Sequence, residues 1–269
     1  SLPLLGWVSI LLIYSYVASI LPVWTLLQPR DYINALQLIS ALGLVIVGLA
    51  VTGIFGGAPL VAGGERPPLE IVAPALQQDA SGSMGLPLMV PFLFVTIACG
   101  AVSGFHCLVS SGTSSKQLSC ERDARFVGYG SMLTEGFLAV LVILACVAGL
   151  GLGLTKGGST FTGVEAWNAQ YGSFSAAKGL DAKVGAFVAG SSNFLKSLGL
   201  SVGFATALMG VFVASFAATT LDTACRLQRY VLQELFGSVI ELKNKGKSSP
   251  PRQGKAWIQN KHVVTIIAI

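Results

Sequence analysis

The sequence predicts an all-α integral membrane protein with five transmembrane helices and a truncated sixth. Hydrophobic residues make up 53% of the chain and charged residues only 11%, which is less than half of the roughly 25% that is usual in soluble domains. The charges are also clustered, so that five long spans contain no Asp, Glu, Lys or Arg apart from Glu135 and Asp222. A helix needs about 20 mostly apolar residues to cross the hydrocarbon core of a bilayer, and each of these spans is long enough.

The five expected helices are separated by connections of very different length. They cover residues 5–27, 33–55, 87–110, 126–153 and 199–225. The first connection contains "QPRDY", where we expect a tight turn in which Pro29 stops one helix and Asp31 caps the next. The first two helices would then form an antiparallel hairpin.

We expect one transmembrane domain over residues 1–269, with two substantial loops. Residues 155–198 are expected to form an external loop that contains two short helices, at "VEAWNAQYGSF" and "VGAFVAGSSNFLKSL". This loop either covers an external entrance or is simply packed. Residues 226–261 are expected to form a basic cytoplasmic loop.

The two ends of the chain suggest a piece of a larger protein. The chain opens with "SLPLLGWVSI", without an initiator Met or a preceding basic stretch, and it closes on the apolar run "KHVVTIIAI". We therefore expect both ends to be truncated and the first apolar span not to be a signal peptide.

The basic residues predict the orientation in the membrane, because Lys and Arg are retained on the cytoplasmic side. With the segment after residue 225 in the cytoplasm, 12 of the 17 Lys and Arg residues lie on that side, and the opposite orientation reverses this ratio. The net charge of +5 therefore requires no nucleic acid. The expected partners are the lipid bilayer, a small-molecule substrate and the remaining helices of the full-length protein.

The stretch "CGAVSGFHCLVSSGT", residues 99–113, is rich in glycine and hydroxyl groups at the end of an apolar span. Glycine weakens a helix, and Ser and Thr hydroxyls can replace backbone partners. Irregular backbone at membrane depth is tolerated only inside protein or beside a wet cavity, and broken helices form substrate sites in secondary transporters. We therefore expect a broken helix whose substrate-binding residues are Gly100, Ser103, Gly104, His106, Ser110 and Ser111.

Helix packing is the alternative explanation of these glycines. Gly100 and Gly104 form a GxxxG pattern, which also lets two straight helices approach closely. His106 is equally compatible with a packing role.

Ionisable groups within apolar spans predict a site for a coupling ion, because such groups are unfavourable at membrane depth. In the expected orientation His106, Glu135 and Asp222 all lie in the cytoplasmic half. Glu135 is farthest from a loop, so it is the favoured proton carrier, with a neutral acid bonded to a neighbouring helix as the alternative. For Asp222 the alternative is an i,i+4 ion pair with Arg226.

Three threonines beside Asp222 suggest that the coupling ion is sodium, since a hard cation prefers oxygen ligands. They are Thr219, Thr220 and Thr223. Their hydroxyls are equally able to bond back to their own helix. Proton and sodium coupling both stay open, and no bound cofactor is expected.

Soluble-enzyme and metal-site motifs are missing from the sequence. It contains no HExxH or GxSxG, and its five cysteines include no CxxC pair. We therefore expect neither an enzyme nor a resident metal.

Three long motifs, in order along the chain, resemble the carbon starvation protein A family of bacterial inner-membrane transporters. They are "LPVWTLLQPRDYIN", "PFLFVTIACGAVSGFHCLVSSGTSSKQLSCERDARFVGYGSMLTEG" and "TTLDTACRLQRYVLQEL". The resemblance implies a fragment of an inverted-repeat transporter core of the LeuT-like (APC-type) class. It also implies a multi-pass protein of the inner membrane that imports peptides or pyruvate when carbon is scarce.

The resulting hypothesis is an ion-coupled secondary active transporter for a small carbon source. One alternative is an intramembrane hydrolase that uses His106 and Glu135. Another is a membrane sensor or scaffold, without transport, in which the glycines only pack helices.

Overall fold

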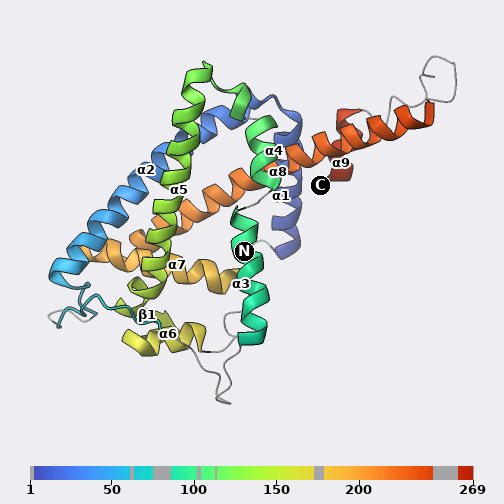
Figure 1. The fold of residues 1–269 in the computed structure, drawn as a ribbon. Helices are drawn as coiled ribbons and strands as arrows, with labels where there is room; N and C mark the ends of the chain where they lie inside the picture. Colours follow the sequence, from blue (N-terminus) through green and yellow to red (C-terminus); the bar gives the residue numbers. More distant parts are fainter. Residues whose placement is uncertain are drawn as a thin grey trace. The chain divides into compact units, whose positions relative to one another are not determined.

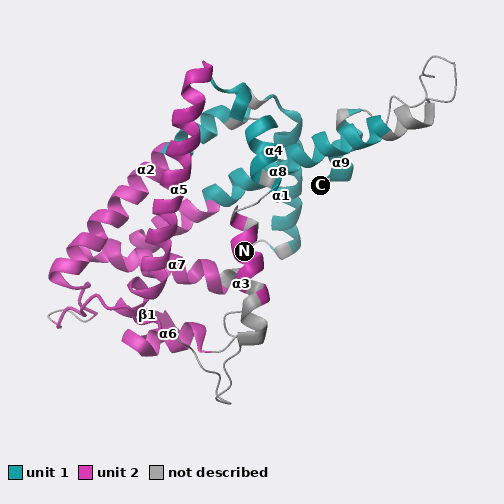
Figure 2. Cartoon of the chain, viewed as in Figure 1, with its two compact units in different colours: residues 1–35, 102–119, 215–269 teal, residues 36–101, 120–214 magenta. Residues whose placement is uncertain are grey.

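The computed structural model places most of the chain in two compact units. Unit 1 comprises residues 1–35, 102–119 and 215–269, and unit 2 comprises residues 36–101 and 120–214 (Figure 2). Within these ranges the structure describes residues 3–60, 64–74, 86–101, 104–112, 114–172, 179–244 and 260–268.

The described residues are mostly helical, as predicted, with one short β-hairpin (Figure 1). The elements are α1 (Leu4–Ile20), α2 (Val23–Phe55), α3 (Leu86–Ala101), α4 (Gly104–Gly112), η1 (Ser114–Lys116), α5 (Glu121–Val147), η2 (Gly149–Leu152), β1 (Leu154–Lys156), β2 (Ser159–Phe161), α6 (Gly163–Tyr171), α7 (Leu180–Ser197), α8 (Val202–Asn244) and α9 (Lys261–Ala268).

Three of the described helical segments are long and apolar enough to cross a membrane. They are Gln28–Phe55, Glu121–Leu152 and Val202–Ser238. Their surfaces expose large apolar side chains, including Ile54 and Phe126, which are 75% and 81% exposed. Such surfaces are typical of proteins that face lipid or further helices. They support a membrane protein, while the count of five spans and a truncated sixth stays a prediction.

The predicted turn at Pro29 is wrong. α1 ends at Ile20, and α2 begins at Val23 and runs through Pro29 as one helix to Phe55. The chain breaks about two turns earlier, at Pro22, because a proline disfavours helical backbone in the residue before it. Leu21, which precedes Pro22, is extended with φ −64° and ψ 148°. Pro29 removes one backbone hydrogen bond without ending the helix, so Asp31 lies inside α2 and caps nothing.

The last long helix extends well beyond its predicted end. α8 continues to Asn244, so the expected loop is wrong over residues 226–244. This segment contains no proline, and Leu227, Val231 and Leu235 recur at helical spacing. Residues 245–259 of the expected loop lie outside the described residues.

The two short helices expected between residues 155 and 198 are confirmed as α6 and α7. The β1–β2 hairpin before them was not predicted. Its two-residue turn is formed by Gly157 and Gly158, whose φ angles are +62° and +84°. Positive φ at both positions fits the turns that two-residue hairpins favour, and the Gly-Gly pair was the available signal.

A close backbone contact joins α5, η2 and α7 inside unit 2. A Cβ atom built on Gly190 of α7 would overlap the carbonyl oxygen of Ala145, and one built on Gly149 would lie 2.6 Å from the carbonyl oxygen of Gly190. Leu150, Leu154, Ala166 and Ala186 form the neighbouring apolar core. The glycines therefore fix how closely α5 and α7 approach.

Replacing Gly190 by Ala should lower the stability of the protein by about 1–3 kcal/mol, because the added methyl group must push two backbones apart. Gly185→Ala is the matched control in the same helix, since no described atom lies within 4 Å of a Cβ built there. Thermal unfolding of the full-length protein in detergent compares the two. Equal melting temperatures would contradict the close contact.

Candidate functional site

A buried carboxylate lies at the centre of unit 1. Asp222 of α8 is 0% exposed and forms an ion pair with Arg30 of α2. The Tyr14 hydroxyl of α1 donates to Asp222 Oδ2 at 2.8 Å and accepts a hydrogen bond from Arg30 Nη1 at 2.9 Å. Three helices therefore meet at one carboxylate oxygen.

The spacing of the contacts shows that α1 and α8 run parallel. Tyr14 contacts Asp222 and Ala18 contacts Arg226, each pair being 208 residues apart in sequence, and the Ser19–Arg229 pair is 210 residues apart. A nearly constant offset is possible only when both helices advance in the same direction. This direction agrees with the predicted alternation, in which the first and fifth spans cross the same way.

α2 runs antiparallel to α8 in unit 1. Arg30 pairs with Asp222, whereas Asn34, one turn later in α2, bonds to Thr219 and Ser215, which precede Asp222 in α8. Asn34 Nδ2 donates to Thr219 Oγ1 at 2.5 Å, and Ser215 Oγ donates to Asn34 Oδ1 at 2.6 Å. A polar seam therefore extends from the ion pair along the α2–α8 contact.

Two buried arginines of α8 donate hydrogen bonds to the last carbonyl groups of α1. The final carbonyls of a helix lack partners within the helix, and α1 is stopped by Pro22. Arg226 Nη2 donates to the carbonyl of Ala18 at 2.6 Å, and Arg229 Nη1 donates to the carbonyl of Ser19 at 2.5 Å. Positive charge is also favourable at a helix C-terminus.

The predicted alternative, in which Asp222 pairs with Arg226 one turn later, is wrong. Arg226 reaches the end of α1, and the ionic contact of Asp222 within the described residues is with Arg30. The Arg30 pair joins two helices, whereas an i,i+4 pair would have joined only neighbouring turns of α8.

Part of the ion pair is left without hydrogen-bond partners among the described residues. Asp222 Oδ1 and Arg30 Nε and Nη2 are buried and make no hydrogen bond there. Arg30 Nη2 lies 3.8 Å from Asp31 Oδ1, which is an ionic contact only. A buried polar atom without a partner is unfavourable, so the site can accept a proton on the carboxylate and an anionic group on the guanidinium.

The three threonines predicted to bind an ion bond to their own helix. Thr219, Thr220 and Thr223 donate to the carbonyls of Ser215, Phe216 and Thr219 at 3.1, 3.0 and 3.1 Å. This is the alternative kept open from the sequence. Thr219 also belongs to the polar seam through Asn34, whereas the Thr220 side chain is exposed. A sodium site here stays a prediction.

The predicted substrate-binding residues lie on α3 and α4 or between them. α3 ends at Ala101 and α4 begins at Gly104, and Ser103 lies outside the described residues. The exposed residues Ser110 and Ser111 both donate to the carbonyl of Cys107, at 2.9 and 3.0 Å, and His106 is exposed on the same helix. The broken helix and its role in substrate binding stay predictions.

The packing alternative for the two glycines gains no support from the described residues. No described atom lies within 4 Å of a Cβ built on Gly100 or Gly104. Gly112, at the end of α4, does approach α8, because its built Cβ lies 3.6 Å from Leu227 Cδ2.

Glu135 lies in α5 of unit 2, where its side chain is exposed. The structure therefore places Asp222 and the half-buried Thr219 in one polar seam between α2 and α8, and it gives Glu135 a different environment. Tyr14, Arg30 and Asn34 were not predicted as partners from the sequence. Arg30 had a usable signal, because it is a single cation between two apolar spans.

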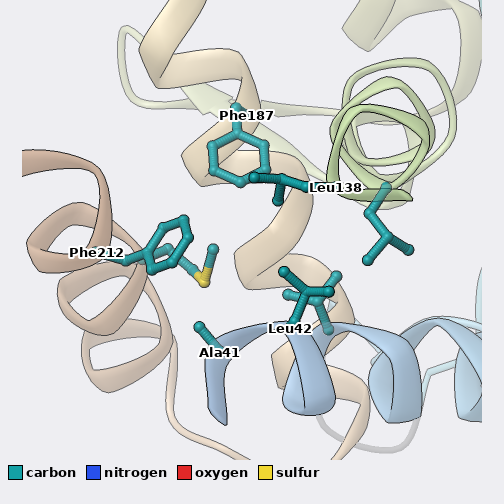
Figure 3. Close-up of a pocket in the computed structure, with 8 residues that line it drawn as sticks. Ala41, Leu42, Leu138, Phe187 and Phe212 are labelled. Carbon is teal, nitrogen blue, oxygen red and sulfur yellow. The ribbon is translucent and has the colours of Figure 1, made fainter. Parts of the chain in front are cut away.

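An apolar gap in unit 2 does not resemble a binding site. Side chains from α2, α5, α7 and α8 converge there, among them Leu42, Leu138, Phe187 and Phe212 (Figure 3). The space measures about 10 Å³, which is at the lower limit for a single water molecule. It is a packing gap between helices.

Comparison with known proteins identifies the family. The family model described as "Carbon starvation protein CstA" matches residues 3–269. The chain belongs to this family. The peptide transporter CstA of Escherichia coli (strain K12) is 36% identical over 261 residues, covering 84% of this chain and 35% of that protein.

Two further relatives match over shorter ranges. The pyruvate/proton symporter BtsT of Escherichia coli (strain K12) is 47% identical over 134 residues, 49% of this chain and 17% of that protein. The peptide transporter CstA of Helicobacter pylori (strain J99 / ATCC 700824) is 44% identical over 141 residues, 52% of this chain and 18% of that protein. The chain thus spans at most about a third of the length of these three relatives. No solved structure matches it.

Replacing Asp222 by Asn should lower the stability of the protein by about 3–5 kcal/mol, because Arg30 then lies buried beside a neutral group. The measurement is unfolding of the full-length protein in detergent.

The double variant Arg30→Met with Asp222→Leu removes both charges and should recover most of that loss, since apolar side chains can replace a buried ion pair. A double variant no more stable than Asp222→Asn would show that the pair is not the source of the effect.

Proposed function

We propose that the full-length protein is an ion-coupled secondary active transporter of the bacterial inner membrane that imports peptides or pyruvate. The observation that carries this proposal is the buried Asp222–Arg30 pair at the meeting point of three helices. Buried charges in membrane helices are unfavourable and mark ion or substrate pathways. The names of the relatives, peptide transporter and pyruvate/proton symporter, supply the substrate classes.

Asp222 is the residue we propose to carry the coupling proton. Its Oδ1 atom is buried and has no hydrogen-bond partner among the described residues, so a proton can be added there. The neighbouring threonine hydroxyls already donate to carbonyls of α8, which favours a proton over a sodium ion at this position. Glu135, the acid favoured by the sequence analysis, is exposed.

Charge balance suggests how proton and substrate movement are linked. In the present arrangement the Asp222 carboxylate neutralises Arg30. A proton on Asp222 removes that counter-ion and leaves a buried guanidinium, which favours binding of another anion. Pyruvate and the C-terminus of a peptide both supply a carboxylate, and Arg groups bind carboxylates with two parallel hydrogen bonds. Proton and substrate would then enter together because only the pair preserves the buried charge.

Uptake by the full-length protein in vesicles, with proton and sodium gradients imposed separately, tests this proposal. Asp222→Asn should abolish accumulation driven by a proton gradient, because the side chain can no longer gain or lose a proton. Exchange of labelled for unlabelled substrate without a gradient should persist, because Arg30 is permanently available. Glu135→Gln is the control and should retain coupling.

Three outcomes would count against the proposal in different ways. If the wild-type protein accumulates neither pyruvate nor dipeptides under any gradient, transport itself is excluded for these substrates. Unchanged proton coupling in Asp222→Asn removes Asp222 from the mechanism. Loss of coupling in Glu135→Gln alone assigns the proton to the site first favoured from the sequence.

A further inference from the structure

Unit 2 contains a second polar site, separate from the ion pair. A cavity of about 420 Å³ lies among residues 58–60, η2, the β1–β2 hairpin and the last turn of α7. This volume falls in the range of roughly 300–1,000 Å³ that is usual for small-molecule pockets. Its wall combines apolar side chains, such as Leu60 and Leu152, with the polar side chains of Thr155, Thr160 and Lys196.

Asn193 fixes the polar wall of this cavity. Its side chain is 4% exposed, and Nδ2 donates to the carbonyls of Gly149 and Gly153, both at 2.8 Å. The remaining oxygen, Oδ1, accepts a hydrogen bond from Lys196 Nζ at 2.8 Å. The asparagine therefore ties η2 to α7 and also holds the lysine at the cavity.

The Lys196 ammonium is half-buried and has no carboxylate partner within 4 Å among the described residues. An ammonium group has three donors, and Asn193 uses one of them. Burial lowers the pKa of Lys196, which is the expected effect on a cation without a nearby anion. The lysine is thus a half-buried donor whose charge is not balanced by a carboxylate among the described residues of unit 2.

We propose that this cavity binds the carboxylate of an incoming substrate, with Lys196 as its cation. The Thr155 and Thr160 hydroxyls, 3.5 Å apart on the hairpin, supply further donors. Leu60 and Leu152 provide apolar surface for a methyl group or a peptide side chain. The inference rests on the proposed transport function, and it places a capture site in the segment expected to lie outside the membrane.

Uptake kinetics of the full-length protein in vesicles test the site. Lys196→Gln should raise KM for pyruvate or a dipeptide about tenfold or more, since a hydrogen bond to a charged group is worth roughly 1.5–3 kcal/mol, with the maximal rate within about twofold. Lys196→Arg should recover part of the affinity. Lys183→Gln is the matched control, because Lys183 is an exposed lysine of the same helix and its replacement should leave KM unchanged.

Two further experiments test whether the group bound by Lys196 is a carboxylate. A dipeptide with an amidated C-terminus should compete poorly in the wild type and no worse in Lys196→Gln, because it lacks the group that the lysine binds. KM in the wild type should rise as pH increases through the lowered pKa of Lys196, because the neutral amine loses its attraction for a carboxylate. This part of the pH dependence should be missing in Lys196→Gln.

The outcomes separate this inference from the proposed function. Uptake with an unchanged KM in Lys196→Gln overturns the site and leaves transport standing. If Lys196→Gln does not reach the membrane, Thr160→Val at the same wall replaces it: a severalfold increase in KM supports the site, and an unchanged KM overturns it. Absence of uptake by the wild type refutes the transport proposal itself. A dipeptide binding assay then tests the cavity alone: weaker binding in Lys196→Gln supports the site, and unchanged binding overturns it.

Discussion

The contact between Arg30 and Asp222 is the interaction on which the arrangement of unit 1 depends. A carboxylate that is fully buried needs a cation and hydrogen-bond donors, and here they come from two other helices. The pair therefore sets the register of α2 against α8, while Tyr14 extends the same constraint to α1. The seam through Asn34 and the arginine contacts at the end of α1 continue the same pairing along α8.

The broad features of the structure could be predicted because they follow from composition over many residues. Long uncharged spans indicate membrane helices whatever their neighbours are, and the periodic segments of α6 and α7 were recognisable in the same way. Asp222 was also identified from the sequence, since a carboxylate inside an apolar span is conspicuous. The transport hypothesis itself came from the family resemblance as well as from these patterns.

Two of the errors concern residues whose role depends on contacts outside their own segment. Pro29 was expected to end the first helix, but the chain leaves helical backbone at Leu21, before Pro22, and α2 continues through Pro29. Arg226 was the nearest cation to Asp222 in sequence, but the carbonyls at the end of α1 supply partners for it, and Arg30 is the cation that reaches the carboxylate. Such choices depend on tertiary contacts, so local spacing alone could not decide them. The Lys196 cavity could not be predicted from local spacing either, because its wall comes from residues 58–60, η2, the β1–β2 hairpin, α7 and the start of α8.

The arginines at the end of α1 have a consequence for how the chain is made. Arg226 and Arg229 are among the charges counted on the cytoplasmic side in the expected orientation, and such charges direct the insertion of a helix into the bilayer. In the finished fold both side chains are buried, at 2% and 6% exposure, against the end of another helix. The same two residues would therefore first influence the orientation of α8 in the membrane and later bind the C-terminal end of α1. A replacement of either arginine can therefore change the orientation of α8 during insertion, before the contact between α8 and α1 has formed.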